Sequence, residues 1–199
     1  MRIIAGEFRG RKLLPPEGDV TRPITDRVKQ SLFDILTPLL PDARVYDVFA
    51  GTGSMGLECL SRGAAHATFF EADRSALARL RTNIQSLDVE GRARVIGGDL
   101  FRWIDDARHV PSGDGRRIDV AFLDPPYRFL RERPDALRRL AEALVLRHLR
   151  PDSAVVFRHD ADDRLDLPGL RRYDERRYSG MALEFFTPQT PAAPTGDGR

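Results

Sequence analysis

The 199-residue sequence has a single cysteine, Cys59, so a disulfide cannot form within the chain. This usage is typical of proteins in a reducing compartment, and we expect a cytoplasmic protein. The four histidines are scattered without metal-ligand spacing, which predicts no metal site. The sequence also lacks an apolar run of about 18 residues and the apolar core of a signal peptide, so it predicts neither a membrane span nor secretion.

A large net charge is absent as well, because acidic and basic residues nearly balance at +2. The basic residues nevertheless cluster in the first thirty positions and again between positions 171 and 177. Arginine is well suited to phosphate recognition, yet charge alone leaves a solvated face equally open. The 41% apolar content is enough for a full core, and we expect one domain over residues 1–187.

Short apolar runs alternate with helical stretches from about residue 44 onward. This alternation predicts an α/β fold of the Rossmann-like type with a doubly wound, mostly parallel sheet. The last two apolar runs flank Ser179 and Gly180, where a turn is expected. The pattern therefore predicts a seven-stranded sheet that finishes with an antiparallel C-terminal hairpin.

Two short extended stretches separated by a glycine turn predict an N-terminal β-hairpin over residues 1–20. A helix is expected next in ITDRVKQSLFDIL, because apolar residues recur there at helical spacing and Thr25 can cap the first turn. Residues 188–199 are rich in Pro, Gly and Thr and have little to bury, so a disordered tail is expected.

A glycine-rich loop follows the first long apolar run in DVFAGTGSMGLE, where Gly51, Gly53 and Gly56 match the pattern G-x-G-x-x-G. Such glycines permit a tight turn and a close approach of the backbone to a ligand. Glu71 lies about twenty positions further on and can accept hydrogen bonds from ribose hydroxyls. The loop by itself fits a nicotinamide dinucleotide or another adenosine cofactor.

Two further acids favour one of these cofactors. Asp47 precedes the glycine loop, where its charge would repel a pyrophosphate and attract a cationic ligand. S-adenosylmethionine carries an ammonium and a sulfonium group in place of phosphates, so a carboxylate at this position can accept from its ammonium. Asp99 ends the third strand and can accept from the adenine amino group. The acids therefore predict S-adenosylmethionine as the cofactor.

The stretch AFLDPPYRFL places an acid, two prolines and an aromatic ring at the end of the fourth strand. Pro125 and Pro126 have no backbone N–H, so the loop is rigid and offers only acceptors. An exocyclic amino group of a nucleobase can donate one hydrogen to Asp124 and one to the Pro125 carbonyl, while Tyr127 stacks on the base. These contacts orient the nitrogen and stabilise the positive charge that forms as it accepts a methyl group. The predicted catalytic residues are Asp124, Pro125, Pro126 and Tyr127.

Four stretches taken together resemble the bacterial small-subunit ribosomal RNA guanine amino-methyltransferases of the RsmD type: RIIAGEFRGRKL, RPITDRVKQSLFDIL, DVFAGTGSMGLECLSRGA and FLDPPY. The resemblance covers about residues 1–187. It implies a class I methyltransferase fold, S-adenosylmethionine as methyl donor, and a guanine amino group of 16S ribosomal RNA as acceptor. The expected partner is 16S ribosomal RNA or the assembled small ribosomal subunit, and a monomer is expected. The cofactor would be held by Asp47, Phe49, Ala50, Gly51, Gly53, Glu71, Ala72, Asp99 and Leu100.

Substrate contacts are expected from the basic N-terminal part, which would dock on RNA phosphates and, at RPITDRV, approach the methionine end of the cofactor. The residues expected to contact substrate are Arg9, Arg11, Lys12, Arg22, Thr25 and Arg27. Three alternatives remain open. They are a nicotinamide-dependent oxidoreductase, a DNA adenine or cytosine amino-methyltransferase, and a non-catalytic RNA-binding or ribosome-assembly module.

Overall fold

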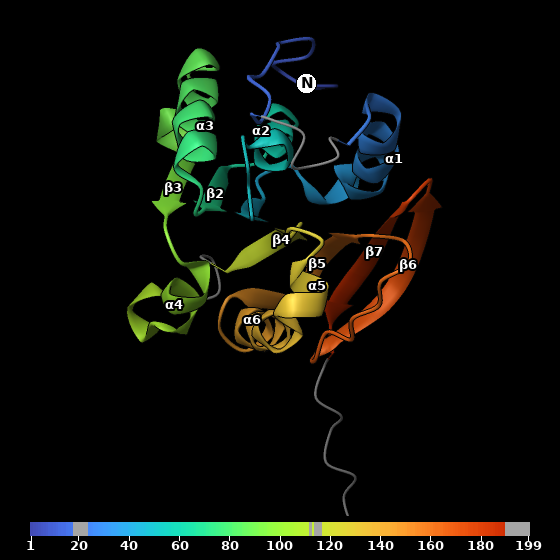
Figure 1. The fold of residues 1–199 in the computed structure, drawn as a ribbon. Coiled ribbons are helices and arrows are strands. Elements are labelled where there is room, and N and C mark those ends of the chain that lie inside the picture. The colour runs from blue at the N-terminus through green and yellow to red at the C-terminus, as the bar shows by residue number, and fades with distance from the viewer. Residues whose placement is uncertain (18–23, 112, 114–116, 190–199) are drawn as a thin grey trace, which may run out of the picture.

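The computed structural model describes residues 1–17, 24–111, 113 and 117–189, and its centre is a seven-stranded sheet (Figure 1). The strand order is β3-β2-β1-β4-β5-β7-β6. β1 to β5 pair in parallel, whereas β7 pairs antiparallel with both β5 and β6. The predicted α/β fold and its C-terminal antiparallel hairpin are confirmed. The strands are β1 (Arg44–Val48), β2 (His66–Glu71), β3 (Ala93–Gly97), β4 (Ile118–Leu123), β5 (Leu149–His159), β6 (Leu170–Tyr178) and β7 (Met181–Pro188).

Helices cover both faces of the sheet (Figure 1). Alternate residues of β1 point to opposite faces, so Val45 joins one core and Val48 the other. In the described part of the chain, no helix has the length and apolar composition that crossing a membrane requires. One face carries α1 (Asp26–Leu36), α2 (Ser54–Ser61) and α3 (Arg74–Ser86), and the other carries α4 (Leu100–Asp105), α5 (Phe129–Glu132) and α6 (Pro134–Arg147). Short 3-10 turns are η1 (Thr37–Leu39), η2 (Glu90–Arg92) and η3 (Ala107–His109).

The N-terminal segment, residues 1–17, differs from the expected β-hairpin. A single antiparallel bridge between Arg2 and Lys12 takes the place of two regular strands. Ile3 and Leu13, which flank this bridge, are nevertheless buried in the core beneath α1 to α3. The two stretches bond to each other at the bridge, where the Ile3 N–H donates to the Arg11 carbonyl, but the backbone between them also bonds to α2: the N–H groups of Glu7 and Phe8 both donate to Ser61.

Glu58, in the middle of α2, is fully buried and anchors this segment. Its carboxylate accepts from the backbone N–H groups of Ile4 and Ala5 at 2.8 and 3.0 Å. It also pairs with Lys29 of α1 and with Arg62, both at 2.9 Å. Burial lowers the pKa of Lys29, and Glu58 opposes that effect. Because a buried carboxylate is tolerated only with its partners in place, this cluster joins the N-terminal segment, α1 and α2 into one unit.

An aromatic cluster fills the core between the sheet and α4. The ring centroids of Phe70 and Trp103 are 4.7 Å apart, and His109 stacks on Trp103 at 4.3 Å. His148 is fully buried beside them, with its Nδ1 atom 3.4 Å from the Tyr46 hydroxyl. Burial lowers the pKa of His148 to about 4, so this ring is neutral in the folded protein near pH 7.

The buried His148 should make the fold sensitive to acid. Between pH 6.5 and 4 the unfolded chain binds a proton at this residue and the folded chain does not, so the free energy of unfolding should fall as the pH falls. The loss approaches about 3 kcal/mol, and above pH 6.5 the residue contributes no pH dependence. Urea unfolding of a His148→Phe variant, which keeps an aromatic ring but cannot be protonated, should show a flatter profile. An equally steep decline in the variant would contradict this assignment.

Candidate active site

Three carboxylates meet where the carboxyl ends of the central parallel strands lie together. Asp47 lies in β1 opposite Phe122 of β4, Glu71 ends β2, and Asp124 follows the last residue of β4. The N–H of Asp124 donates to the carbonyl of Val48 at 3.4 Å, which holds this loop against the end of β1. The strand order reverses between β1 and β4, and open α/β sheets bind ligands at such a point.

Asp47 is buried and holds the start of α2. Its Oδ2 atom accepts from the backbone N–H of Gly56 at 2.8 Å. The pKa of Asp47 is raised to about 7, mainly by burial and partly by the charges of Asp124 and Glu71, while the Gly56 bond opposes this shift. The observed contact of this carboxylate is thus with the protein backbone, and the expected contact with a ligand ammonium stays a prediction.

Glu71 fastens the glycine loop to the end of β2. One carboxylate oxygen accepts from the N–H of Gly51 at 2.7 Å, and the other accepts from Ala72 and Asp73 at 2.8 Å each. The N–H of Ala50 donates to the carbonyl of Phe70 and adds a second link between the loop and β2. The loop is therefore held in place by an acid that also lies where a ribose would bind in this class of fold.

The glycines of the loop serve two different purposes. A Cβ atom added to Gly51, whose φ is +55°, would meet no other atom within 4 Å, so this position borders open space. A Cβ atom at Gly56 would lie 2.3 Å from the ring of Phe69, because α2 packs closely on β2 there. Gly53 starts α2 with a φ of +88° and is also closely surrounded. Only Gly51 leaves room for a ligand to approach.

The two glycines should respond differently to alanine. Gly51→Ala places a methyl group in the open space at a left-handed backbone position, so it should weaken ligand binding and cost about 1 kcal/mol of stability. Gly56→Ala forces α2 away from Phe69 and should cost about 1–3 kcal/mol from overpacking. Thermal unfolding together with calorimetric titration of S-adenosylmethionine separates the two effects. Equal ligand affinity in Gly51→Ala and the wild type would show that the loop does not contact the ligand.

Asp99 lies at the same edge of the sheet, two strands from β1. It is exposed and caps α4, since its carboxylate accepts from the N–H of Phe101 at 2.9 Å. The preceding Gly98 donates its N–H to the carbonyl of Glu71 at 3.0 Å, which ties this turn to β2. Leu100 is buried beneath it. The structure thus brings Asp99 and Leu100 to the edge that carries Asp47, Glu71 and the glycine loop.

An aromatic cluster beside Asp99 was not predicted from the sequence. Phe49 follows β1 with a φ of +69°, and its ring lies between those of Phe101 and Phe129 at centroid distances of 6.2 and 6.0 Å. The guanidinium of Arg133 lies over both outer rings, 4.7 Å from the Phe101 centroid and 5.2 Å from the Phe129 centroid. A left-handed conformation is costly for phenylalanine, so these contacts hold a strained residue in place.

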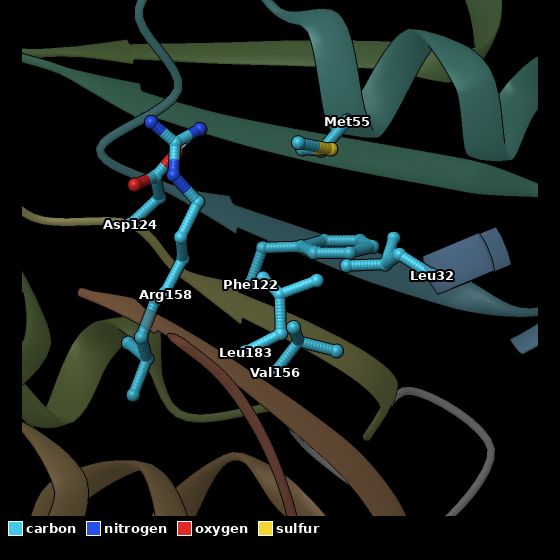
Figure 2. Close-up of a pocket in the computed structure, with 8 residues that line it drawn as sticks. Leu32, Met55, Phe122, Asp124, Val156, Arg158 and Leu183 are labelled. Carbon is cyan, nitrogen blue, oxygen red and sulfur yellow. Dashed lines mark ion pairs between the residues drawn. The ribbon is translucent and has the colours of Figure 1, made fainter. Parts of the chain in front are cut away.

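The DPPY loop, residues 124–127, carries the remaining acid (Figure 2). The loop turns tightly, because the Pro126 carbonyl accepts from Phe129 at 2.8 Å and the Tyr127 carbonyl accepts from Leu130 at 3.2 Å. Pro125 is buried, whereas Pro126 and Tyr127 are half-exposed. The side chain of Asp124 is 25% exposed. Its carboxylate can therefore accept a hydrogen bond from a substrate beside this fixed loop.

Asp124 has a charged partner that the sequence does not reveal. Arg158 of β5 contacts its Oδ2 atom through Nη1 at 3.0 Å, and its guanidinium carbon lies 6.0 Å from the centroid of the Tyr127 ring. Burial raises the pKa of Asp124, and Arg158 opposes this by favouring the ionised form. Figure 2 shows the two side chains meeting above a small apolar pocket lined by Leu32, Met55, Phe122, Val156 and Leu183.

Three of the predicted substrate residues lie away from this edge. Arg9, Arg11 and Lys12 are exposed, and Arg11 donates to the carbonyl of Ser86 at the end of α3. α3 begins near the active-site edge and runs for 13 residues, so this cluster lies about 20 Å from the edge. Thr25 caps α1 by accepting from the N–H of Val28 at 3.4 Å, and Arg27 is exposed on the first turn of α1. Arg22 lies outside the described residues.

Comparison with known proteins agrees with this geometry. The profile of the family described as conserved hypothetical protein 95 matches residues 1–187. The chain belongs to this family. A curated relative is ribosomal RNA small subunit methyltransferase D of Escherichia coli K12, which is 41% identical over 128 residues. That alignment covers 64% of this chain and 61% of the relative, so it spans less than two thirds of the curated protein.

Solved structures of similar proteins align with nearly the whole length of this chain. The Escherichia coli protein yhhF superposes with a TM-score of 0.79 at 32% identity and covers 95% of this chain and 98% of its own. An RNA methyltransferase from Salinibacter ruber, solved with S-adenosyl-L-homocysteine, shares the fold with a TM-score of 0.61 at 18% identity, over 86% of this chain and 98% of its own. The predicted Rossmann-like methyltransferase fold and the family resemblance are confirmed.

Proposed function

We propose that the protein transfers a methyl group from S-adenosylmethionine to the exocyclic amino group of a guanine in small-subunit (16S) ribosomal RNA. The position of Asp124 carries this proposal. Its carboxylate is accessible, follows a buried strand, and lies beside a glycine loop at the ligand-binding edge of the sheet. The relative named ribosomal RNA small subunit methyltransferase D supports the choice of ribosomal RNA as substrate.

The residues at the edge of the sheet fit S-adenosylmethionine. The open space at Gly51 allows close approach to the loop, and Glu71 and Asp99 offer carboxylates for a ribose and an adenine amino group. Phe49, Ala50, Ala72 and Leu100 adjoin these acids along the same turns. When bound, the cofactor supplies a methyl group activated by its sulfonium. A neighbour of the same fold was solved with the product form of this cofactor, which supports the assignment.

The chain itself would bind and orient the base. The Asp124 carboxylate accepts one hydrogen of the amino group and the Pro125 carbonyl accepts the other, while Tyr127 stacks on the ring. Holding both hydrogens directs the nitrogen lone pair away from them, and the two oxygens stabilise the positive charge that forms on the nitrogen. Burial raises the pKa of Asp124, and Arg158 opposes this by favouring the ionised form, which is the form that accepts hydrogen bonds through both oxygens.

Replacing Asp124 by alanine should abolish methyl transfer and leave cofactor binding nearly intact. The variant loses an acceptor for the amino group, which should lower the single-turnover rate at least about 100-fold. Calorimetry should show a dissociation constant for S-adenosylmethionine within a few-fold of the wild type. Asp119→Ala is the matched control, because Asp119 lies near the start of the same strand and pairs with Arg150. If affinity fell together with activity, Asp124 would belong to the cofactor site.

The competing functions differ in measurable ways. A nicotinamide-dependent oxidoreductase would bind NAD and not S-adenosylmethionine in the same calorimetric experiment. A DNA amino-methyltransferase would label duplex DNA in preference to ribosomal RNA, and a non-catalytic assembly factor would label neither. Nucleoside mass spectrometry of small-subunit ribosomal RNA from cells that lack the protein, before and after incubation with it, should show N2-methylguanosine appearing only after incubation.

The N-terminal basic residues are proposed to dock on RNA phosphates at a distance from the DPPY loop. A triple alanine variant of Arg9, Arg11 and Lys12 should bind ribosomal RNA more weakly and lower the slope of log affinity against log salt by about 2. Its affinity for S-adenosylmethionine should not change. An unaltered slope in the folded variant would show that these residues form a solvated face. A control with equal loss of charge on the other face of the sheet replaces Arg138, Arg139 and Arg147.

A further inference from the structure

Arg158 occupies an unusual place for an arginine. It lies near the end of β5, where the register of Leu123 with Phe157 brings it beside Asp124. Only 8% of the residue is exposed, and its side chain lines one side of the apolar pocket and reaches the carboxylate (Figure 2). Withdrawing a guanidinium from water is costly, and the surrounding apolar side chains strengthen each hydrogen bond that it makes.

Favouring the ionised form of Asp124 is one effect of this cation, but its positive charge also works against methyl transfer. Positive charge forms on the amino nitrogen during the reaction, and a guanidinium close to the same carboxylate reduces the stabilisation that the carboxylate provides. A donor placed next to the acceptor is useful, however, when the substrate presents both a donor and an acceptor. A guanidinium carries five N–H groups in a planar fork, more than one carboxylate oxygen can accept.

We propose that Arg158 determines base specificity by donating a hydrogen bond to the O6 atom of the target guanine. This inference rests on the proposed function. The Pro125 carbonyl accepts one hydrogen of the 2-amino group, the Asp124 carboxylate accepts the other together with N1–H, and Arg158 donates to the oxygen at the far end of the same edge. Along this edge the protein thereby presents acceptors followed by a donor. This is the order in which cytosine faces guanine in a Watson–Crick base pair.

The three bases with amino groups differ along this edge. Starting from the amino group, guanine presents a donor at N1 and then an acceptor at O6. Cytosine presents two acceptors, N3 and O2, so the first of them would face the Asp124 carboxylate without a hydrogen between them. Adenine presents an acceptor at N1 and then a C–H group, which leaves the Arg158 donor unmatched. A buried donor or acceptor without a partner costs about 1–3 kcal/mol, so guanine is favoured.

An atomic substitution in the RNA tests this contact directly. The guanosine that the wild-type protein methylates is first located by mass spectrometry, and ligated ribosomal RNA is then prepared with guanosine or 6-thioguanosine at that position alone. The sulfur atom is a weak acceptor, while the 2-amino and N1–H groups remain. Wild-type single-turnover methylation should be about tenfold slower with 6-thioguanosine. Equal wild-type rates would overturn the proposal.

The variant Arg158→Met assigns the effect to this residue. Its rate should be lower on guanosine RNA, and the ratio between the two RNAs should fall close to one. Arg158→Gln, whose shorter side chain ends before the position of the guanidinium, should give the same ratio and replaces the first variant if that variant does not fold. The matched control is Arg150→Met, because Arg150 pairs with Asp119 at 2.9 Å near the other end of the same two strands. It should keep the wild-type ratio.

The possible results distinguish failure of the proposed function from failure of the Arg158 contact alone. If the wild-type protein methylates no guanosine of the ribosomal RNA, the proposed function fails and the role of Arg158 fails with it. If guanosine is methylated and the tenfold ratio persists in Arg158→Met, O6 is recognised by another group and only the role of Arg158 is wrong. A purely structural role of Arg158 would lower both rates by the same factor and leave the ratio unchanged.

Discussion

The cost of burying carboxylates governs the edge of this sheet. Parallel pairing brings Asp47, Glu71 and Asp124 to the ends of adjacent strands, where burial first, and then the charges of the other two acids, raise the pKa of Asp47. Each carboxylate is stabilised by its own hydrogen-bond donors or by a cation. Asp47 accepts from the amide of Gly56, Glu71 accepts from three amides, and Asp124 pairs with Arg158. The conformation of the surrounding loops follows from these contacts, because the loops supply the amides.

The hydrogen bonds from backbone amides to these carboxylates also fix the glycine loop. The glycine loop is bonded to Glu71 at one end and to Asp47 at the other, so it is already in position before a ligand arrives. Groups that are placed in advance need no reorganisation during a reaction, and this is a main source of catalytic power in enzymes. The strained backbone of Phe49 belongs to the same arrangement, since neighbouring aromatic rings hold it where the loop begins.

The buried charged cluster that joins the helices is separate from the acids of the candidate site. The Glu58 cluster lies within α2 and joins the N-terminal segment to α1, with Lys29 and Arg62 as its cations. It is closed and fully buried, whereas Asp124 and Glu71 stay partly accessible. The exposed basic residues of the N-terminal segment lie beyond this cluster, toward the ends of α2 and α3. An RNA that contacts both regions would therefore have to extend along the α1 to α3 side of the molecule.

The sequence alone determined the fold and much of the site, because those features depend on local patterns. The alternation of apolar runs and helical stretches predicted the parallel sheet, and the positions of Asp47, Glu71, Asp99 and Asp124 at strand ends predicted where they would meet. Thr25 was correctly predicted as the cap of α1. In the N-terminal segment, the sequence predicted the pairing of two stretches, seen in the Ile3 N–H bond to the Arg11 carbonyl, but not the bonds from the intervening backbone to α2.

Only the tertiary structure decided which partners these acids have. Arg158 meets Asp124 because β4 and β5 pair with Leu123 opposite Phe157, and the sequence of neither strand specifies that register. The rings of Phe101 and Phe129 reach Phe49 from two separate turns, again through strand order. Asp47 points inward to Gly56 because α2 packs against β2 at the distance that glycine allows. Contacts between residues distant in the chain depend on how strands pair and helices pack, and local sequence patterns specify neither.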